Sequence, residues 1–156
     1  MRDEAWFDEH YRAHSVAVYR YFVRRAPGAD AEDLAADVFA TAWRRRDDVP
    51  AEAVLPWLYR TAGFVLANYR RKQVPVPVET LPDVTDDDDP ALAAVADDDV
   101  RRALRGLSDR DRTILMLHAW EGLVGESLAA ALEISRGGAD AALSRARSRL
   151  AALWQS

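Results

Sequence analysis

The feature that most constrains this chain is an acidic, proline-rich stretch near its middle. Residues 73–100 contain nine acidic side chains, four prolines and no basic residue. A segment of this composition offers little apolar surface to bury, and its negative charges repel one another, so it is unsuited to a packed core. We therefore expect residues 73–96 to be an extended linker between two separately folded blocks, residues 1–72 and residues 97–156.

The same stretch sets the sign of the net charge, which is −5 for the whole chain. Residues 1–72 carry 12 basic and 11 acidic side chains, and residues 101–156 carry nine basic and six acidic ones. Both flanking blocks are thus mildly basic. The overall acidity therefore does not exclude a nucleic-acid partner.

Several classes of protein are excluded by composition. The chain has no cysteine, which rules out disulfides, thiolate catalysis and cysteine-bound zinc. It has no apolar run long enough to span a membrane, and its charged N-terminus lacks the apolar segment of a signal peptide, so we expect a soluble, cytoplasmic protein. His10 and His14 have a helical spacing that a metal could use, but no third ligand is evident. Without a nucleophile–base pair or a phosphate-binding glycine loop, we expect neither an enzyme nor a cofactor.

The first block has the pattern of a helical bundle. Leu34, Val38 and Ala42 recur at helical spacing within residues 30–46, and Asp30 is placed to cap that helix. A further helix is expected from residue 57 to about residue 72, where a run of cations suits the negative end of the helix dipole.

The second block has the outline of a helix-turn-helix. Ser108 and Asp111 resemble a capping box that opens a helix ending near Trp120. A short helix over residues 126–132, a turn over residues 133–135 and a long helix follow. The predicted fold class is therefore all-α, with two small helical domains joined by a flexible acidic linker.

Two ordered sets of motifs flank the linker. Before it come DAEDL (30–34), DVF (37–39), AWR (42–44), WLYRTA (57–62) and NYRR (68–71), and after it come ALRGLS (103–108), EGL (121–123), GESLA (125–129) and LSRAR (143–147). Each motif is weak alone. In this order they resemble conserved regions 2 and 4 of the extracytoplasmic-function (ECF) group of sigma-70 factors, and the resemblance covers nearly all of the chain outside the linker.

The resemblance implies a protein that joins bacterial RNA polymerase core to promoter DNA, with no small-molecule substrate and no obligate homo-oligomer. Region 2 would dock on the polymerase clamp and open the −10 element, and region 4 would bind the polymerase flap and the −35 element. Many relatives are held inactive by an anti-sigma factor, so such a partner is expected here. The alternative is a sigma-like adaptor or antagonist that occupies the polymerase or a protein partner without reading promoters.

The resemblance and the side-chain chemistry together give candidate contact residues. The expected polymerase contacts are Asp33, Asp37, Phe39 and Trp43, although the spacing of the two aromatic residues also favours core packing. Aromatic rings beside cations suit melted, single-stranded DNA. The candidate DNA contacts are Tyr59, Arg60, Phe64, Asn68, Arg70, Arg71, Lys72, Arg136, Gly138, Asp140, Ser144, Arg145 and Arg147.

The sequence departs from the family pattern in three places. Gly63 and Phe64 replace a pair that usually includes asparagine, so a DNA base could be stacked there but not hydrogen-bonded. Glu133 replaces a glycine of the turn, which costs roughly 1 kcal/mol if its backbone is left-handed. Residues 138–142 place an acid and alanines where basic and polar groups usually stand. We therefore predict weak −35 binding, with region 2 dominating promoter choice.

Overall fold

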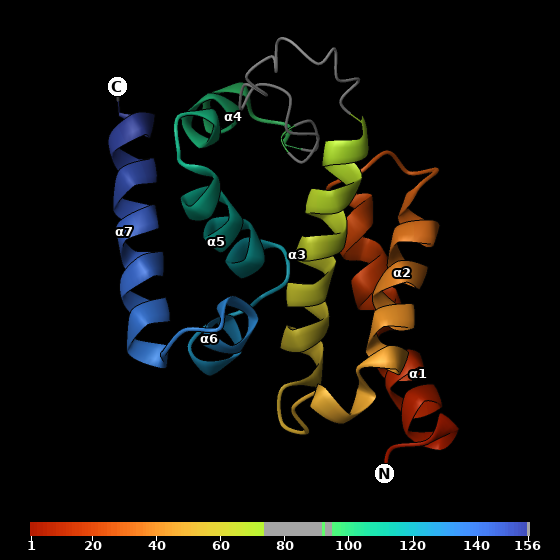
Figure 1. Cartoon of the computed structure of the whole chain (residues 1–156). Helices are drawn as coiled ribbons and strands as arrows, with labels where there is room; N and C mark the ends of the chain where they lie inside the picture. The colour runs from red at the N-terminus through yellow and green to blue at the C-terminus, as the bar shows by residue number, and fades with distance from the viewer. Residues whose placement is uncertain (74–91, 93–94, 156) are drawn as a thin grey trace, which may run out of the picture.

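The computed structural model describes residues 1–73, 92 and 95–155. These residues form only helices, with no strand among them, so the predicted all-α class is confirmed (Figure 1). In chain order the elements are α1 (Glu4–Val23), α2 (Ala31–Arg44), a 3-10 turn (Arg46–Asp48), α3 (Val54–Gln73), α4 (Asp98–Arg105), α5 (Asp109–Ala119), α6 (Glu126–Leu132) and α7 (Arg136–Trp154).

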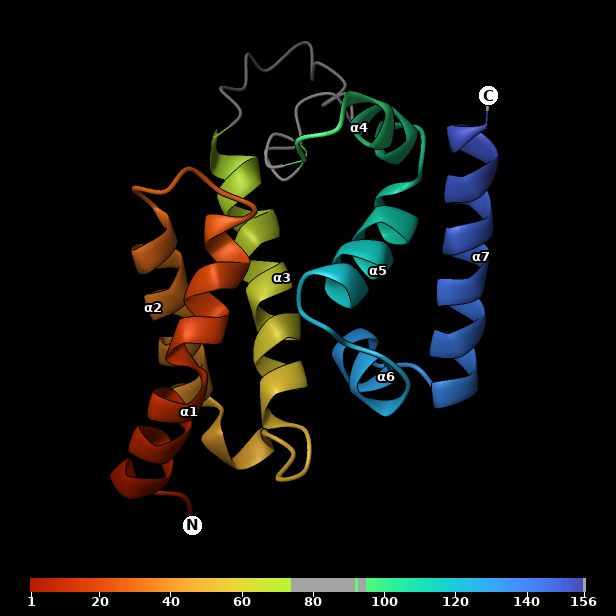
Figure 2. The same ribbon diagram turned by 180° about the vertical axis from the view of Figure 1, so that it is seen from behind.

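Helices α1, α2 and α3 form an up-down-up bundle, which we call the α1–α3 bundle (Figures 1 and 2). Its centre is built from Val18 and Phe22 of α1, Val38 of α2 and Leu58 of α3, each of which is no more than 1% exposed. These positions recur at helical spacing on one face of each helix, and burying those faces against one another supplies the main stabilisation of the bundle.

Two details at helix starts differ from the sequence prediction. Helix α3 begins at Val54 and includes Pro56 in its first turn, where the missing N–H would have no intrahelical partner in any case. Asp30 occupies the N-cap position of α2, as predicted, but its side chain makes no capping hydrogen bond. Instead, its carboxylate accepts a hydrogen bond from the hydroxyl of Tyr69 on α3.

Helices α4 to α7 form a second unit, the α4–α7 unit, and its helix starts are fixed by side-chain caps. The hydroxyl of Ser108 accepts a hydrogen bond from the N–H of Asp111 at 3.2 Å, and that of Ser135 accepts one from the N–H of Gly138 at 3.0 Å. The short helix α6, the turn and the long helix α7 lie at the predicted positions, so the helix-turn-helix is confirmed.

The predicted linker lies mostly outside the described residues, which omit residues 74–91 and 93–94. Its described end is packed rather than extended. Leu92 is 1% exposed within the core, and Val95 packs against the same core. The guanidinium of Arg101 fixes this segment by donating a hydrogen bond to the carbonyl of Leu92 at 3.1 Å.

The two units also pack on each other, mainly through α3 and α6 (Figures 1 and 2). Helix α3 lies between α2 on one side and α6 on the other in both views. Within the part of the chain that the structure describes, no helix is both long enough and apolar enough to cross a membrane.

Candidate nucleic-acid interface

The two acidic residues among the candidate polymerase contacts lie on the outer face of α2. Asp33 and Asp37 lie one helical turn apart, both are exposed, and neither forms an ion pair within the described residues. Phe39 is only 5% exposed, and Trp43 is half-buried. Both rings pack edge-on against Phe7 of α1, so they mainly hold the bundle together.

Helix α3 presents a stripe of Arg60, Phe64, Asn68 and Arg71, which we call the α3 stripe. These residues follow one another at helical spacing, and Phe64 is 61% exposed. The guanidinium of Arg60 lies 5.0 Å from the centre of the Phe64 ring, and the exposed Lys72 adds a further cation at the C-terminal end. An exposed ring between cations is the arrangement that single-stranded nucleic acid requires.

Two other candidate DNA residues of α3 lie outside this stripe. Tyr59 is 6% exposed, with its ring centre 5.8 Å from that of Tyr21 on α1. Burial raises the pKa of the Tyr59 phenol, and the negative charge of Glu121 raises it further, against the opposing effect of the neighbouring arginines. Arg70 is half-buried and donates a hydrogen bond to the carbonyl of Arg25 at 3.4 Å.

A buried ion-pair cluster joins the two units next to Tyr59. The side chain of Glu121, which follows α5, is fully buried and accepts hydrogen bonds from Arg24 and Arg25 at the end of α1, each at 3.0 Å. The Arg25 guanidinium also lies 3.8 Å from the centre of the Tyr21 ring and 5.1 Å from that of Trp120. Sequence reasoning did not find this cluster, because no local pattern links residues so far apart in the chain.

A second interdomain ion pair involves the turn of the helix-turn-helix. The carboxylate of Glu133 lies 2.5 Å from the guanidinium of Arg60, the first residue of the α3 stripe. Glu133 has φ 54° and ψ 46°, so the left-handed conformation that was expected of a residue replacing glycine is confirmed. The side chain that occupies this strained position therefore also contacts the candidate DNA surface.

The start of the recognition helix α7 has little positive charge to offer. Arg136 is shared between two carboxylates, at 3.8 Å from Glu126 and 4.0 Å from Asp140. The N–H of Gly138 is used by the cap from Ser135, and a glycine offers no side chain to a base edge. These residues are the ones that a recognition helix would insert into the major groove.

The later cations of α7 are mostly engaged within the unit. Arg147 contacts Nε2 of His118 at 2.7 Å, and Arg149 pairs with the buried Asp111 at 2.8 Å. His118 in turn contacts the carbonyl of Leu123 through Nδ1 at 2.9 Å, so it links α5, the following loop and α7. Ser144 and Arg145 are exposed and face solvent from the middle of the helix.

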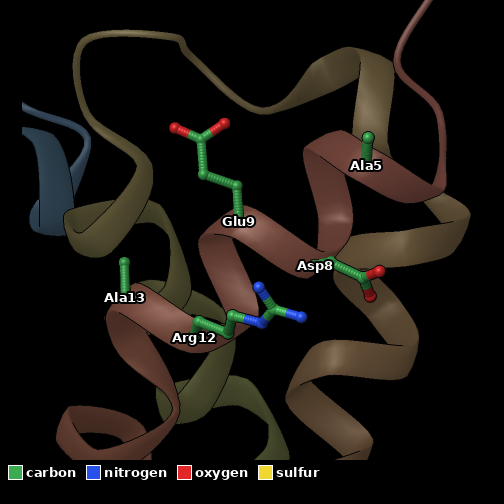
Figure 3. A pocket seen from close by; sticks show the side chains of 5 residues that line it. All are labelled: Ala5, Asp8, Glu9, Arg12 and Ala13. Atoms are coloured by element: carbon green, nitrogen blue, oxygen red, sulfur yellow. The ribbon is translucent and has the colours of Figure 1, made fainter.

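One hollow on the described surface is formed by a single helix. A shallow hollow on the outer face of α1 is lined by Ala5, Asp8, Glu9, Arg12 and Ala13, all exposed and all from this single helix (Figure 3). Such an open surface encloses nothing. Among the described residues, no three or more histidine or acidic side chains converge on a point that could hold a metal ion.

Comparison with known families places these surfaces in context. The family description Sigma-70 region 2 matches residues 9–75, and Sigma-70, region 4 matches residues 97–150. The RNA polymerase sigma-E factor of Streptomyces avermitilis is 31% identical over 157 residues, covering 92% of this chain and 82% of the relative. The chain belongs to the sigma-70 family.

The ECF group is supported by a further relative of this sigma factor. The ECF RNA polymerase sigma factor SigF of Caulobacter vibrioides is 32% identical over 157 residues, covering 96% of this chain and 86% of the relative. Two solved structures have a similar fold at low identity. RpoE in complex with the anti-sigma factor NepR from Bartonella quintana has a TM-score of 0.61 at 22% identity and covers 96% of each chain. CnrH in complex with the cytosolic domain of CnrY has a TM-score of 0.62 at 21% identity and covers 98% of this chain and 90% of that one.

Membership of the family fixes the general role of the chain. It is an RNA polymerase sigma factor of the ECF group, and the partners of such a factor are the polymerase core and promoter DNA. Sigma factors are a family of non-enzymes, which direct transcription initiation by binding.

Proposed function

We propose that this sigma factor binds polymerase core through the acidic face of α2 and reads promoters mainly through the α3 stripe. Residues 1–72 would act as the core-binding and −10 module, and residues 97–156 as the −35 module. The observation that carries this ranking is the exposed ring of Phe64 between cations on α3. A base flipped out of melted DNA can stack on that ring while Arg71 and Lys72 attract its backbone phosphates.

Two exposed carboxylates of α2, Asp33 and Asp37, form no ion pair within the described residues and support the polymerase contact. Asp33 and Asp37 project from a helix whose opposite face is fixed in the core by Val38 and Leu34, so their positions are rigid. Exposed charges with no partner in the free protein lose little on binding a basic partner surface, and they steer the encounter. Phe39 and Trp43 would support that surface from beneath.

The −35 module is expected to contribute less specificity in this protein. Arg136 is held between Glu126 and Asp140, and the groove-facing turn otherwise offers glycine and alanine. Arg145 and the exposed hydroxyl of Ser144 lie farther along α7, where contact with backbone phosphates or with the polymerase flap is more natural than base readout.

We also propose that the protein works in the cytoplasm, catalyses no reaction and is regulated by an anti-sigma factor. The first two follow from the role of a sigma factor in transcription. The third is supported by two solved structures of similar fold, RpoE in complex with the anti-sigma factor NepR and CnrH in complex with the cytosolic domain of CnrY. Co-purification from cells, with identification of the bound chains, would test it.

The ranking of the two modules is tested by in vitro transcription with purified core polymerase. The promoters would be selected by sequencing the DNA that the holoenzyme retains, and then substituted separately in the −10 and the −35 element. We expect −10 substitutions to reduce open-complex formation more than −35 substitutions do. The opposite order would contradict the ranking, and a holoenzyme that gave no transcript from any selected promoter would contradict the proposal as a whole.

A further inference from the structure

A hydrogen-bonded chain of three residues, which we call the His118 relay, runs from the loop after α5 to the middle of α7. The carbonyl of Leu123 lies 2.9 Å from Nδ1 of His118, and Nε2 of the same ring lies 2.7 Å from the guanidinium of Arg147. The ring belongs to the last turn of α5, and Arg147 is an exposed residue of α7. One imidazole therefore links the loop to a cation of the recognition helix.

The two neighbours of the imidazole fix its protonation. A carbonyl oxygen can only accept a hydrogen bond, so Nδ1 of His118 must carry a proton. A guanidinium can only donate, so Nε2 must be bare. The relay therefore requires a neutral imidazole in its Nδ1–H form. A charged ring would lose the acceptor and would face Arg147 as a second cation.

The loop end of the relay is held in place by backbone contacts. The N–H of Leu123 donates a hydrogen bond to the carbonyl of Leu117 at 3.1 Å, and the N–H of Gly122 donates one to the carbonyl of His118 at 3.1 Å. Gly122 has φ 72°, which a glycine adopts without strain, and Leu123 is only 5% exposed. The Leu123 carbonyl is therefore a fixed point that orients the ring and, through the ring, the guanidinium.

Arg147 keeps its positive charge because its partner is neutral. Elsewhere on α7, Arg149 pairs with the buried carboxylate of Asp111, and Arg136 is shared between two carboxylates. Within the described residues, no carboxylate lies within ion-pair distance of Arg147. The imidazole occupies one N–H of the guanidinium, and the other N–H groups remain available to an anion.

The guanidinium also lies on a face of α7 suited to a DNA backbone. Asp140, Ser144 and Arg147 follow one another at spacings of four and three residues, so they share one side of the helix. The helix rises about 10 Å from Asp140 to Arg147, close to the major-groove width of about 12 Å. A helix that inserts its first turn into the groove would bring Arg147 to the phosphates at the edge.

We propose that His118 is a positioning residue for promoter binding, which holds the guanidinium of Arg147 ready for one backbone phosphate at the −35 element. This assignment rests on the proposed −35 role of residues 97–156. A side chain already held in one orientation loses less conformational entropy on binding than a free arginine does. Because phosphates carry no sequence information, the contact anchors α7 on DNA and leaves its sequence preference weak.

The relay itself can be tested without DNA or polymerase. In the full-length protein labelled with nitrogen-15 histidine, the ring nitrogens give signals that show which of them carries a proton. The chain has three histidines, and the spectrum of His118→Phe identifies the signals of His118. At neutral pH we expect a protonated Nδ1 and a bare Nε2. A proton on Nε2 of His118 would overturn the relay.

The DNA contact is measured as the affinity of the holoenzyme for a promoter duplex at several salt concentrations. Arg147→Ala should lower the affinity on the order of tenfold and flatten the dependence of log affinity on log salt by about one unit. The loss should be the same for any −35 sequence. Arg110→Ala, which removes an exposed cation from the first turn of α5, is the matched control and should leave the salt dependence unchanged.

A double-mutant cycle separates positioning from packing. His118→Phe keeps a ring of similar size but removes both nitrogens, and it should lower the affinity about threefold with little change in the salt dependence, because Arg147 keeps its charge but loses its fixed orientation. In an Arg147→Ala background the same change should have no further effect. Equal losses in both backgrounds would show that His118 only packs α5 on α7, which would overturn the positioning role. Circular dichroism would verify the helices, and His118→Leu replaces the ring variant if that variant does not fold.

A truncated duplex separates this assignment from the proposed function. If removal of the −35 DNA weakens binding but Arg147→Ala does not, then Arg147 contacts no phosphate and the assignment is overturned, whereas the −35 module stands. If a duplex without the −35 DNA binds as tightly as the full promoter, the −35 role of residues 97–156 fails, and the phosphate contact fails with it. The nitrogen-15 spectrum would still report the relay in the free protein.

Discussion

The hydroxyl of Tyr69 donates a hydrogen bond to the carboxylate of Asp30, which ties the last turns of α3 to the start of α2. Asp30 would otherwise be expected to cap α2, so the contact replaces a local interaction by one between helices. It also fixes the direction of the segment that carries Asn68 and Arg71. The phenol of Tyr69 therefore adds a polar contact to the apolar packing between α2 and α3.

We expect Tyr69→Phe to lower the free energy of unfolding by about 1 kcal/mol, because the change leaves a half-buried carboxylate without its donor. Urea denaturation followed by circular dichroism would measure the loss. Tyr19→Phe is the control, since Tyr19 is 43% exposed on α1 and its hydroxyl forms no hydrogen bond within the described residues. Equal stabilities of the two variants would show that the hydrogen bond contributes nothing.

Two phenols should make the fold sensitive to alkaline pH. The pKa of Tyr69 is raised above 10, mainly by its hydrogen bond to Asp30, and that of Tyr59 is raised mainly by burial. The folded protein then holds these protons more tightly than the unfolded chain does, so their stabilisation is complete below pH 10 and is lost as the pH rises through the raised values. Thermal melts at pH 9 and pH 11 should show this loss, and Tyr69→Phe should show less of it.

The acidic face of α2 should be required for binding to the polymerase. Changing Asp33 and Asp37 together to Lys should reduce affinity for core polymerase by at least tenfold, because two attractive charges become repulsive at the interface. Both residues are exposed, so helicity should not change. The control is the charge reversal of Glu9 and Glu52, two exposed acids elsewhere on the bundle. Undiminished core binding by the Asp33 and Asp37 variant would show that these acids serve only the dipole of α2.

Phe64 should determine how the −10 element is read. Phe64→Ala should weaken binding of the holoenzyme to single-stranded −10 DNA by about 1–3 kcal/mol, the value of one stacked base. Phe64→Asn should instead change the preferred −10 sequence, because an amide offers hydrogen bonds that a ring does not. Competition between −10 oligonucleotides of different sequence would measure both effects. Unchanged affinity in Phe64→Ala would remove this residue from the interface.

Asp140→Lys should strengthen the −35 contact. The change removes an acid that lies 4.0 Å from Arg136 and adds a cation on the same turn. Each new phosphate contact should steepen the dependence of log affinity on log salt by about one unit. Filter binding of the holoenzyme at several salt concentrations would measure the slope, with Glu52→Lys as the control for total charge. An unchanged slope would mean that this turn does not approach DNA.

Local patterns in the sequence predicted the helices well, and their mutual contacts poorly. Ser108 caps the start of α5 as predicted, and α6 and α7 follow at the expected places. The cap that Ser135 gives α7 was not predicted, although it is equally local. Asp30 has the same local signal, yet Tyr69 reaches it from another helix and takes its carboxylate. A helix cap can be predicted from residues close together in the sequence. A competing hydrogen bond from a distant residue cannot, because only the fold brings the two residues together.

The candidate site, too, was predictable from the sequence only where its residues lie on one helix. Phe64, Asn68 and Arg71 share a face because helical spacing places them there, and this could be predicted from the sequence. That Tyr59 is buried could not, because its ring packs against Tyr21 of another helix, which no local pattern reveals. The left-handed backbone of Glu133 was predictable from the family pattern, whereas its pairing with Arg60 was not.

The position of α2 on the far side of α3 from α6 implies an order of events (Figures 1 and 2). Asp33 and Asp37 are exposed on that side of the molecule, so we expect polymerase core to reach them without first separating the α1–α3 bundle from the α4–α7 unit. The association rate constant with core should then be independent of the ion pairs that Glu121 and Glu133 form with arginines of the bundle. Capture of the polymerase and rearrangement of the two units would be separate steps, and the first would set how fast this factor competes for core.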